Sequence, residues 1–134
     1  MSLIAEIKAH EGYSSTVYKD TLGKDTIGYG FLIKGLELDE DICDLILKRK
    51  LERNKRILQK KLTWFDSKPK EVQRILQNMF YQLHFKLFQF KKTLSYIEKG
   101  DYNNASYEML DSLWAKQTPN RASELSCRMG KVNE

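Results

Sequence analysis

The hydrophobic pattern of the chain changes from helical to extended near residue 12. Leu3, Ile4 and Ile7 recur at helical spacing, so residues 3–11 are predicted to form a short amphipathic helix that Gly12 ends. From residue 17 to residue 33, apolar and small residues alternate instead, around a turn at residues 21–24. This second pattern predicts a β-hairpin or a three-stranded ribbon, which is too small to be stable by itself.

A long helix is predicted to follow the ribbon. Asp39 is a suitable N-cap, and neither glycine nor proline interrupts the chain from there to about Leu62. At about 1.5 Å per residue, this helix is on the order of 35 Å long. Its leucines form one stripe, which consists of Leu47, Leu51, Leu58 and Leu62. Lysines and arginines cover much of the remainder, a pattern that is typical of a solvated helix face.

The rest of the chain repeats the helical pattern. The apolar positions from Val72 to Leu83 follow an i, i+3, i+4, i+7 spacing after Pro69. Two further helices are indicated by Leu87, Phe90, Leu94 and Ile97, closed by Gly100, and by Tyr107, Leu110, Leu113 and Trp114. A last helix should begin with Thr118 as N-cap and Pro119 at its first position, and bury Ala122, Leu125 and Met129.

These elements predict an α+β fold that is mostly helical. The chain is expected to form a single domain over residues 1–134, with a small β-hairpin lobe at about residues 13–60. The long helix serves as a spine. A helical lobe is expected at about residues 61–134, together with the N-terminal helix of residues 3–11.

The composition is that of a soluble globular protein. Of 134 residues, 41% are hydrophobic and 31% are charged, and no apolar run approaches the ~20 residues that a membrane helix requires. Residues 1–10 are too charged for a signal peptide, so we expect a protein made in the cytoplasm that needs help to leave it. Cys43 and Cys127 are expected to be unpaired thiols, and neither they nor His10 and His84 form a metal-binding or cofactor pattern.

The charge of the chain points to a polyanionic partner without identifying it. The formal net charge is +5 at pH 7. Nucleic acid, anionic lipid and the acidic bacterial wall are all compatible with this charge.

Glu11 is a candidate general acid. It follows Ile7 by four residues and so extends the apolar face of the first helix, where partial desolvation would favour the protonated form. The alternative is that the helix frays before Glu11 and leaves the carboxyl group in water.

Asp20 and Thr26 flank the predicted turn of the hairpin. Side chains of these types commonly bond to nearby backbone groups in turns. The two arms of a short hairpin lie side by side, however, so Asp20 and Thr26 can also face a common cleft. Two carboxyl groups in different environments are what glycoside hydrolysis requires, and Glu11 and Asp20 are such a pair.

Two segments resemble the phage-type lysozymes of glycoside hydrolase family 24. The first contains Glu11-Gly12, Tyr18, Asp20 and Gly23, followed by Thr26-Ile27-Gly28-Tyr29-Gly30. The second comprises Asn78-Met79-Phe80-Tyr81-Gln82, then Trp114 and the run Gln117-Thr118-Pro119-Asn120-Arg121-Ala122. The resemblance therefore extends from the first predicted helix to the last, and it implies a two-lobed lysozyme-like fold.

The resemblance also implies a function. It implies an endolysin that hydrolyses the bond between N-acetylmuramic acid and N-acetylglucosamine with inversion, needs no cofactor and causes lysis of the host cell. Glu11 would be the proton donor, Asp20 the residue that activates water, and Thr26 a ligand of that water. Gln82 and Arg121 would support the acid. Saccharide contacts are implied for Leu32, Tyr81 and Thr93.

Its expected partner is bacterial peptidoglycan, which the protein would reach from the host cytoplasm through a holin. We expect a monomer with no nucleic-acid partner and no stable membrane association. Three alternatives remain open: a lytic transglycosylase, a non-catalytic wall-binding relative, and a basic helical nucleic-acid binder. The last has support in the lysine- and arginine-rich spine helix but no recognition motif.

The sequence departs from the family pattern at several positions. Phe31 and Lys50 stand where relatives have a histidine and an acid that pair with each other. The connection from Gly30 to the spine helix is about twenty residues shorter than in a relative from the T-even phages. Leu83-His84-Phe85 replaces a glycine-containing turn, and Glu108 replaces an asparagine that contacts saccharide in relatives. Substrate preference is therefore less well defined by the sequence than reaction type.

Overall fold

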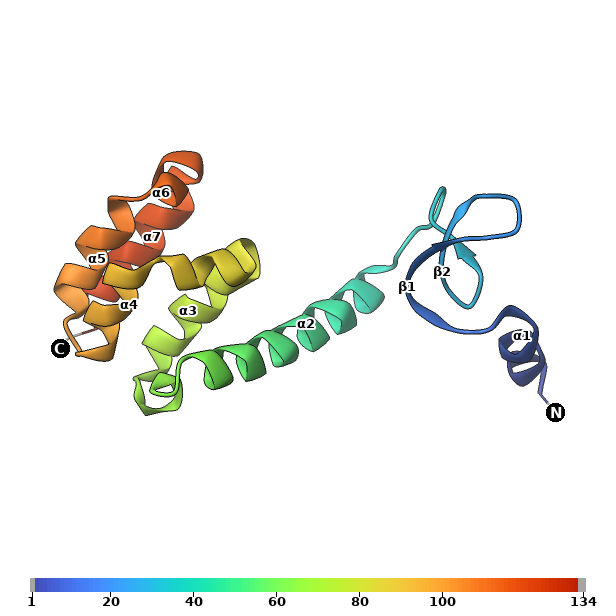
Figure 1. Cartoon of the computed structure of the whole chain (residues 1–134), viewed down its shortest axis with the longest axis horizontal. Helices are drawn as coiled ribbons and strands as arrows, with labels where there is room; N and C mark the ends of the chain where they lie inside the picture. The colour runs from blue at the N-terminus through green and yellow to red at the C-terminus, as the bar shows by residue number, and fades with distance from the viewer. Residues whose placement is uncertain (1, 133–134) are drawn as a thin grey trace. The chain divides into compact units, whose positions relative to one another are not determined.

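The computed structural model describes residues 2–132, and the contacts within it divide the chain into two compact units, Met1–Asp44 and Leu45–Glu134. Both units are coloured along the chain in Figure 1. The secondary structure is mostly helical with one small antiparallel sheet, which confirms the predicted α+β class. The predicted lobe boundaries within a single domain stay a prediction.

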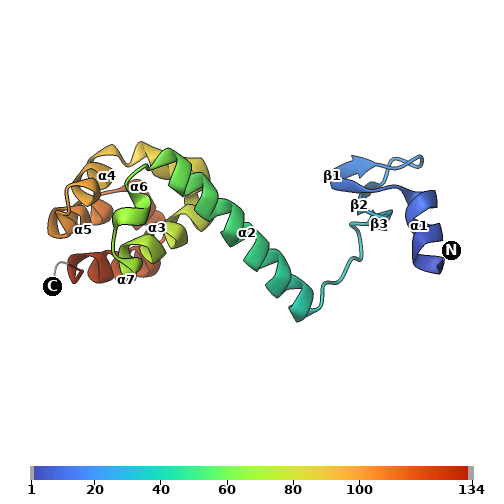
Figure 2. The ribbon, with the colours of Figure 1, turned by 90° about the horizontal axis from the view of Figure 1, so that it is seen from below.

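The first unit consists of helix α1, the sheet and the beginning of the long helix α2 (Glu40–Lys61). Helix α1 (Leu3–Glu11) begins after Ser2, whose hydroxyl accepts a hydrogen bond from the Ala5 amide, and ends at Gly12 with φ of 69°. Strands β1 (Ser14–Lys19), β2 (Asp25–Gly28) and β3 (Phe31–Leu32) pair in that order (Figure 2). The predicted three-stranded ribbon is thereby confirmed, with a shift of register in β1 between Ser14 and Tyr18.

Aromatic contacts join α1 to the turn between β2 and β3. The Lys8 ammonium lies 5.2 Å from the centre of the Tyr29 ring, and the Tyr13 ring lies 5.5 Å from the same ring. These contacts place the C-terminal end of α1 beside the glycines of the turn.

The second unit is helical. The spine helix α2 (Glu40–Lys61) matches its predicted bounds, and the carbonyl of Asp39 accepts hydrogen bonds from the Ile42 and Cys43 amides at its start. The helices that follow are η1 (Phe65–Ser67), α3 (Lys70–Leu83), η2 (His84–Gln89), α4 (Lys91–Glu98), α5 (Tyr102–Leu110), α6 (Leu113–Gln117) and α7 (Pro119–Gly130). Helix α7 packs against α3, α5 and α6 (Figure 1).

The core of the second unit is formed by the apolar faces that the sequence predicted. Val72, Ile75, Leu76 and Met79 of α3 are fully buried. The predicted buried side of the last helix, Ala122, Leu125 and Met129, faces the same core. Leu58 and Leu62 bring the end of α2 into it, whereas Leu47 is 41% exposed.

Two details of the sequence prediction were wrong. The helix expected over Leu87 to Ile97 is broken at Phe90, whose ψ of 60° separates the 3-10 helix η2 from α4. The helix expected over Tyr107 to Trp114 is divided between α5 and α6, because Ser112 is extended and caps α6 with its hydroxyl.

Thr118 is the N-cap residue of α7, as predicted. Pro119 occupies the first turn as predicted, but the Thr118 hydroxyl does not cap the helix. It donates instead to the Trp114 carbonyl over 3.0 Å.

Among the helices described for residues 2–132, none has the length and apolar character that a membrane-spanning helix needs.

Candidate active site

Glu11 is the last residue of α1, and its carboxyl group lies against Gly30. A Cβ atom added to Gly30 would lie 2.8 Å from the Glu11 carboxyl carbon, a separation that real Cβ atoms essentially never show. Gly30 has φ of 73°, a backbone conformation that glycine adopts without steric cost. The positive φ therefore favours glycine at this position, and a side chain at residue 30 would displace the Glu11 carboxyl group from its present place.

The expected burial of Glu11 on an apolar helix face is not found in this unit. No residue of α1 is buried, and Glu11 itself is exposed. The helix nevertheless extends to Glu11 without fraying, so the side chain is fixed at its base by helical backbone.

Asp20 follows β1 and shapes the hairpin turn. One of its carboxylate oxygens, Oδ1, accepts hydrogen bonds from the Leu22 amide at 2.9 Å and the Lys24 amide at 2.8 Å. The Asp20 carbonyl accepts a further bond from the Gly23 amide. This is the turn chemistry that the sequence indicated. In the described part of the chain the other oxygen, Oδ2, has no hydrogen bond from protein.

Thr26 lies in β2 and is 2% exposed. Its hydroxyl donates to the Lys24 carbonyl over 2.9 Å. The hydroxyl proton is thus directed at the backbone, which leaves the lone pairs of the Thr26 oxygen as acceptors.

The backbone of Lys24 connects Asp20 to Thr26. Its amide donates to the Asp20 carboxylate, and its carbonyl accepts from the Thr26 hydroxyl. The strand register agrees with these hydrogen bonds. Tyr18 is opposite Thr26, and the Asp20 amide donates to the Lys24 carbonyl. Since side chains alternate along a strand, Asp20 and Thr26 are diagonal neighbours on one face of the hairpin.

Leu32 lies in β3 directly opposite Thr26 in the register and is 43% exposed. It lines a surface depression of about 520 Å³ on the sheet together with Gly23, Lys24 and Lys34. An exposed leucine beside a depression is suited to contact with the apolar face of a sugar ring.

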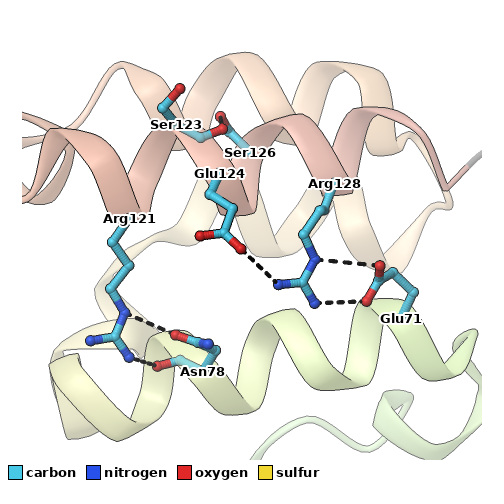
Figure 3. Close-up of polar contacts among 7 residues, drawn as sticks. All are labelled: Glu71, Asn78, Arg121, Ser123, Glu124, Ser126 and Arg128. Atoms are coloured by element: carbon cyan, nitrogen blue, oxygen red, sulfur yellow. Dashed lines mark hydrogen bonds and ion pairs between the residues drawn. The ribbon is translucent and has the colours of Figure 1, made fainter.

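The second unit holds the other predicted site residues. Arg121 of α7 is bound to Asn78 of α3, as Figure 3 shows. Its Nε donates to the Asn78 side-chain oxygen over 2.9 Å, and its Nη2 donates to the Asn78 carbonyl over 3.0 Å. This pair of bonds fixes the plane of the guanidinium group.

Gln82 is held in a similar way. Its side-chain oxygen accepts a hydrogen bond of 2.9 Å from the indole nitrogen of the buried Trp114. This bond identifies which atom of the Gln82 amide group is the oxygen, and so fixes the direction in which the amide nitrogen points. Tyr81 precedes Gln82 in α3 and is 38% exposed.

Thr93 lines a pocket of about 480 Å³ in the second unit. It is 3% exposed, and the pocket is also lined by Phe90 and Trp114, whose ring centres are 6.2 Å apart. Lysines and carboxylates complete much of the lining, namely Lys86, Lys91, Lys92, Glu108 and Asp111. The Glu108 substitution noted in the sequence therefore changes the charge of a pocket.

Sequence reasoning assigned no role to Asn78, Trp114 or the Lys24 backbone. Asn78 precedes Gln82 by four residues, so helical spacing places both on one face of α3, and this signal was present in the sequence. Lys24 contributes only its backbone amide and carbonyl groups. Its role therefore does not depend on residue type and could not be recognised from the sequence.

A second arginine of α7 strengthens its contact with α3 (Figure 3). Arg128 Nη2 lies 2.8 Å from Glu71 Oε1, and Arg128 Nε donates to Glu71 Oε2 over 3.4 Å. This hydrogen bonding lowers the pKa of Glu71 and raises the pKa of Arg128. Elsewhere in the unit, burial raises the pKa of Tyr102.

No metal-binding group of three or more His, Cys, Asp or Glu side chains occurs within residues 2–132.

Comparison with known proteins gives one family. A family model described as Phage lysozyme matches residues 8–130, a span that contains every candidate site residue. No curated protein was found to match the chain.

Proposed function

The chain belongs to the phage lysozyme family, and from this we propose that it is an inverting muramidase that uses Glu11, Asp20 and Thr26. The family makes it a glycosidase-type enzyme with peptidoglycan as its substrate. The bond that we propose is the β-1,4 linkage between N-acetylmuramic acid and N-acetylglucosamine. The observation that carries the mechanism is the joint attachment of Asp20 and Thr26 to Lys24.

Glu11 is proposed as the general acid. Its carboxyl group stands at the end of a helix, exposed, against a residue that has no side chain to obstruct it. A glycosidic oxygen can approach such a group directly. Protonation of that oxygen converts the departing sugar into a neutral alcohol, which lowers the barrier to bond cleavage.

Asp20 and Thr26 are proposed to hold the attacking water. Asp20 Oδ1 is occupied by two amides, so Oδ2 is the oxygen available to accept a water proton. The Thr26 oxygen is an acceptor for the second water proton, because its own proton is bound to Lys24. A water held by both protons directs its lone pair outward, towards the anomeric carbon. Asp20 takes up one proton as the new bond forms.

This assignment corresponds to the inverting reaction. The acid acts on one side of the sugar and the water attacks from the other. Such enzymes keep their two carboxyl groups about 6.5–9.5 Å apart to accommodate the water. The carboxylate of Asp20 also stabilises the positive charge that develops on the ring.

Residues of the second unit are proposed to support the acid and bind sugar. Arg121 and Gln82 are both fixed by hydrogen bonds, to Asn78 and Trp114 respectively, and fixed polar groups need little rearrangement to act. Tyr81 and Thr93, together with Leu32 of the first unit, are proposed saccharide contacts. Leu32 and Thr93 each line a depression of the surface, which supports their assignment.

In the cell, we propose that the enzyme is a monomeric endolysin. It would accumulate in the cytoplasm of the host, reach the wall through a holin and cause lysis. It would form no stable association with the membrane.

The assignment of the acid is tested by Glu11→Gln, with Glu6→Gln as its matched control. Both residues are exposed glutamates of α1, so the two variants make the same substitution in the same helix. Release of reducing ends from purified peptidoglycan should fall by 10²–10⁴-fold in Glu11→Gln alone, the usual contribution of a general acid. Near wild-type activity of Glu11→Gln would show that another group is the acid.

A further inference from the structure

The positive charge of this protein is concentrated in one segment of α2. Residues 45–61 contain eight lysines and arginines and one acid, a net charge of +7. The whole chain has a formal charge of +5, so the remaining residues together carry −2. The basic character of the protein is therefore a local property of this helix.

The eight cations are available to a partner. All are exposed, namely Lys48, Arg49, Lys50, Arg53, Lys55, Arg56, Lys60 and Lys61. The ion pairs found among residues 2–132 involve Lys19 and Arg128 as cations, so none of the eight is neutralised by a described carboxylate. Like charges three or four residues apart on a helix repel each other. A surface that served only solubility would carry both signs.

Four of these cations form a straight row. Arg49, Arg53, Arg56 and Lys60 follow an i, i+4, i+7, i+11 spacing and so share one face of α2. Successive members rise by about 4.5–6 Å, and the row is about 16 Å long. At 100° per residue, the leucine stripe lies on the opposite side, where Leu58 and Leu62 are buried in the core.

We propose that this row, the basic row of α2, binds a linear wall polymer of phosphodiester-linked polyols. Guanidinium groups bind phosphate through paired hydrogen bonds, and three of the four side chains are arginines. The spacing of the row suits a flexible chain with one phosphate in each short repeat. The identification of the wall as the source of this polymer rests on the proposed function.

The structure favours this partner over two other polyanions. Single-stranded nucleic acid is normally bound with aromatic side chains on which bases stack, and residues 45–61 contain no aromatic residue. A helix that lies in a membrane surface inserts an apolar face. The leucine stripe of α2 is buried in the protein core at Leu58 and Leu62. At these two residues it cannot insert into a membrane.

The test compares two full-length variants that each lose four positive charges. In the first, Arg49, Arg53, Arg56 and Lys60 are changed to Gln, which preserves helix propensity. In the control, four exposed lysines outside α2 are changed to Gln, namely Lys70, Lys99, Lys116 and Lys131. Binding to poly(glycerol phosphate) is measured by titration at several salt concentrations, and circular dichroism verifies that both variants are folded.

The proposal predicts a selective effect. The row variant should bind on the order of 10²-fold more weakly at low salt, and the control variant by less than about threefold. The wild-type affinity should fall with salt at a log–log slope of about −3, as expected for four contacts on a flexible polyanion. Equal losses in the two variants, or no binding by the wild type, would overturn the proposal.

Two further measurements separate this proposal from its alternatives. Single-stranded DNA of equal charge should bind more weakly, since its bases gain no stacking on this face; equal or tighter binding would assign the row to nucleic acid. Hydrolysis of peptidoglycan freed of phosphate polymers should be equal in the wild type and the row variant. If neither protein releases products, the proposed function fails while the binding result stands.

Discussion

The carboxyl group of Glu11 lies so close to Gly30 that an added Cβ atom would be 2.8 Å from the carboxyl carbon. This contact links the end of α1 to the turn between β2 and β3.

The contact predicts that Gly30→Ala displaces the acid. The change should reduce peptidoglycan hydrolysis by at least about tenfold and destabilise the unit by about 1–2 kcal/mol, the usual cost of positive φ in a residue with a side chain. Gly35→Ala is the matched control, because Gly35 has φ of 84° and no atom within 4 Å of an added Cβ. Loss of activity in Gly30→Ala but not in Gly35→Ala is expected. Equal effects would mean that backbone strain alone is responsible.

Asp20→Asn should separate the structural role of Asp20 from its proposed chemical role. The amide side chain retains an oxygen that can accept the Leu22 and Lys24 amides, so the turn should persist. The negative charge and the proton acceptor are lost, so hydrolysis should fall by 10²-fold or more. Thermal unfolding and product release, measured on the same sample, distinguish the structural role of Asp20 from its chemical role. A variant that is folded and fully active would restrict Asp20 to turn formation.

Much of the fold could be predicted from the sequence, because hydrophobic periodicity directly reports which face of a helix is buried. Val72 to Leu83 and the buried side of α7 are examples. The breaks at Phe90 and Ser112 could not be predicted in this way, since apolar residues continue through both breaks. At these points a local backbone conformation overrides a continuous pattern.

The candidate site was predictable only where residue types carry the chemistry. Glu11, Asp20 and Thr26 were candidates by residue type and predicted position, and their assigned roles come from the resemblance to the family. The link through Lys24 consists of backbone atoms, and the fixation of Arg121 by Asn78 depends on how α3 and α7 pack. Neither relationship has a signature in a single sequence. The catalytic roles themselves stay predictions.

His84→Gly should stabilise the second unit. His84 has φ of 52°, and it is the one non-glycine residue with positive φ among residues 2–132. A conformation of this kind costs about 1–3 kcal/mol in a residue with a side chain. Urea unfolding should show a gain of about 1 kcal/mol for His84→Gly relative to His84→Ala, which loses the same ring but keeps the Cβ atom. No gain would indicate that His84 is not strained in solution.

The Glu71–Arg128 pair should contribute to stability only above acid pH. Arg128 lowers the pKa of Glu71 below its ordinary value of 4.5, so folding favours the ionised form. Its contribution is therefore complete above about pH 4.5 and is lost as pH falls through the lowered pKa. Because Glu71 is 42% exposed, we expect no more than about 1 kcal/mol.

Unfolding of wild type and Glu71→Gln at a series of pH values measures this contribution. The wild type should be more stable at pH 7, and the difference should shrink below about pH 4.5. A difference that is constant from pH 7 to pH 2 would show that the charge of Glu71 is not its source.

Mass spectrometry of the products released from purified peptidoglycan in H₂¹⁸O tests the central claim most directly. Hydrolysis through water held by Asp20 and Thr26 predicts muropeptides with reducing N-acetylmuramic acid ends that carry ¹⁸O, from the wild type and not from Glu11→Gln. Products lighter by one water, with anhydro-muramic ends and no ¹⁸O, would contradict the claim, because the hydroxyl group of the sugar itself would then have replaced the water.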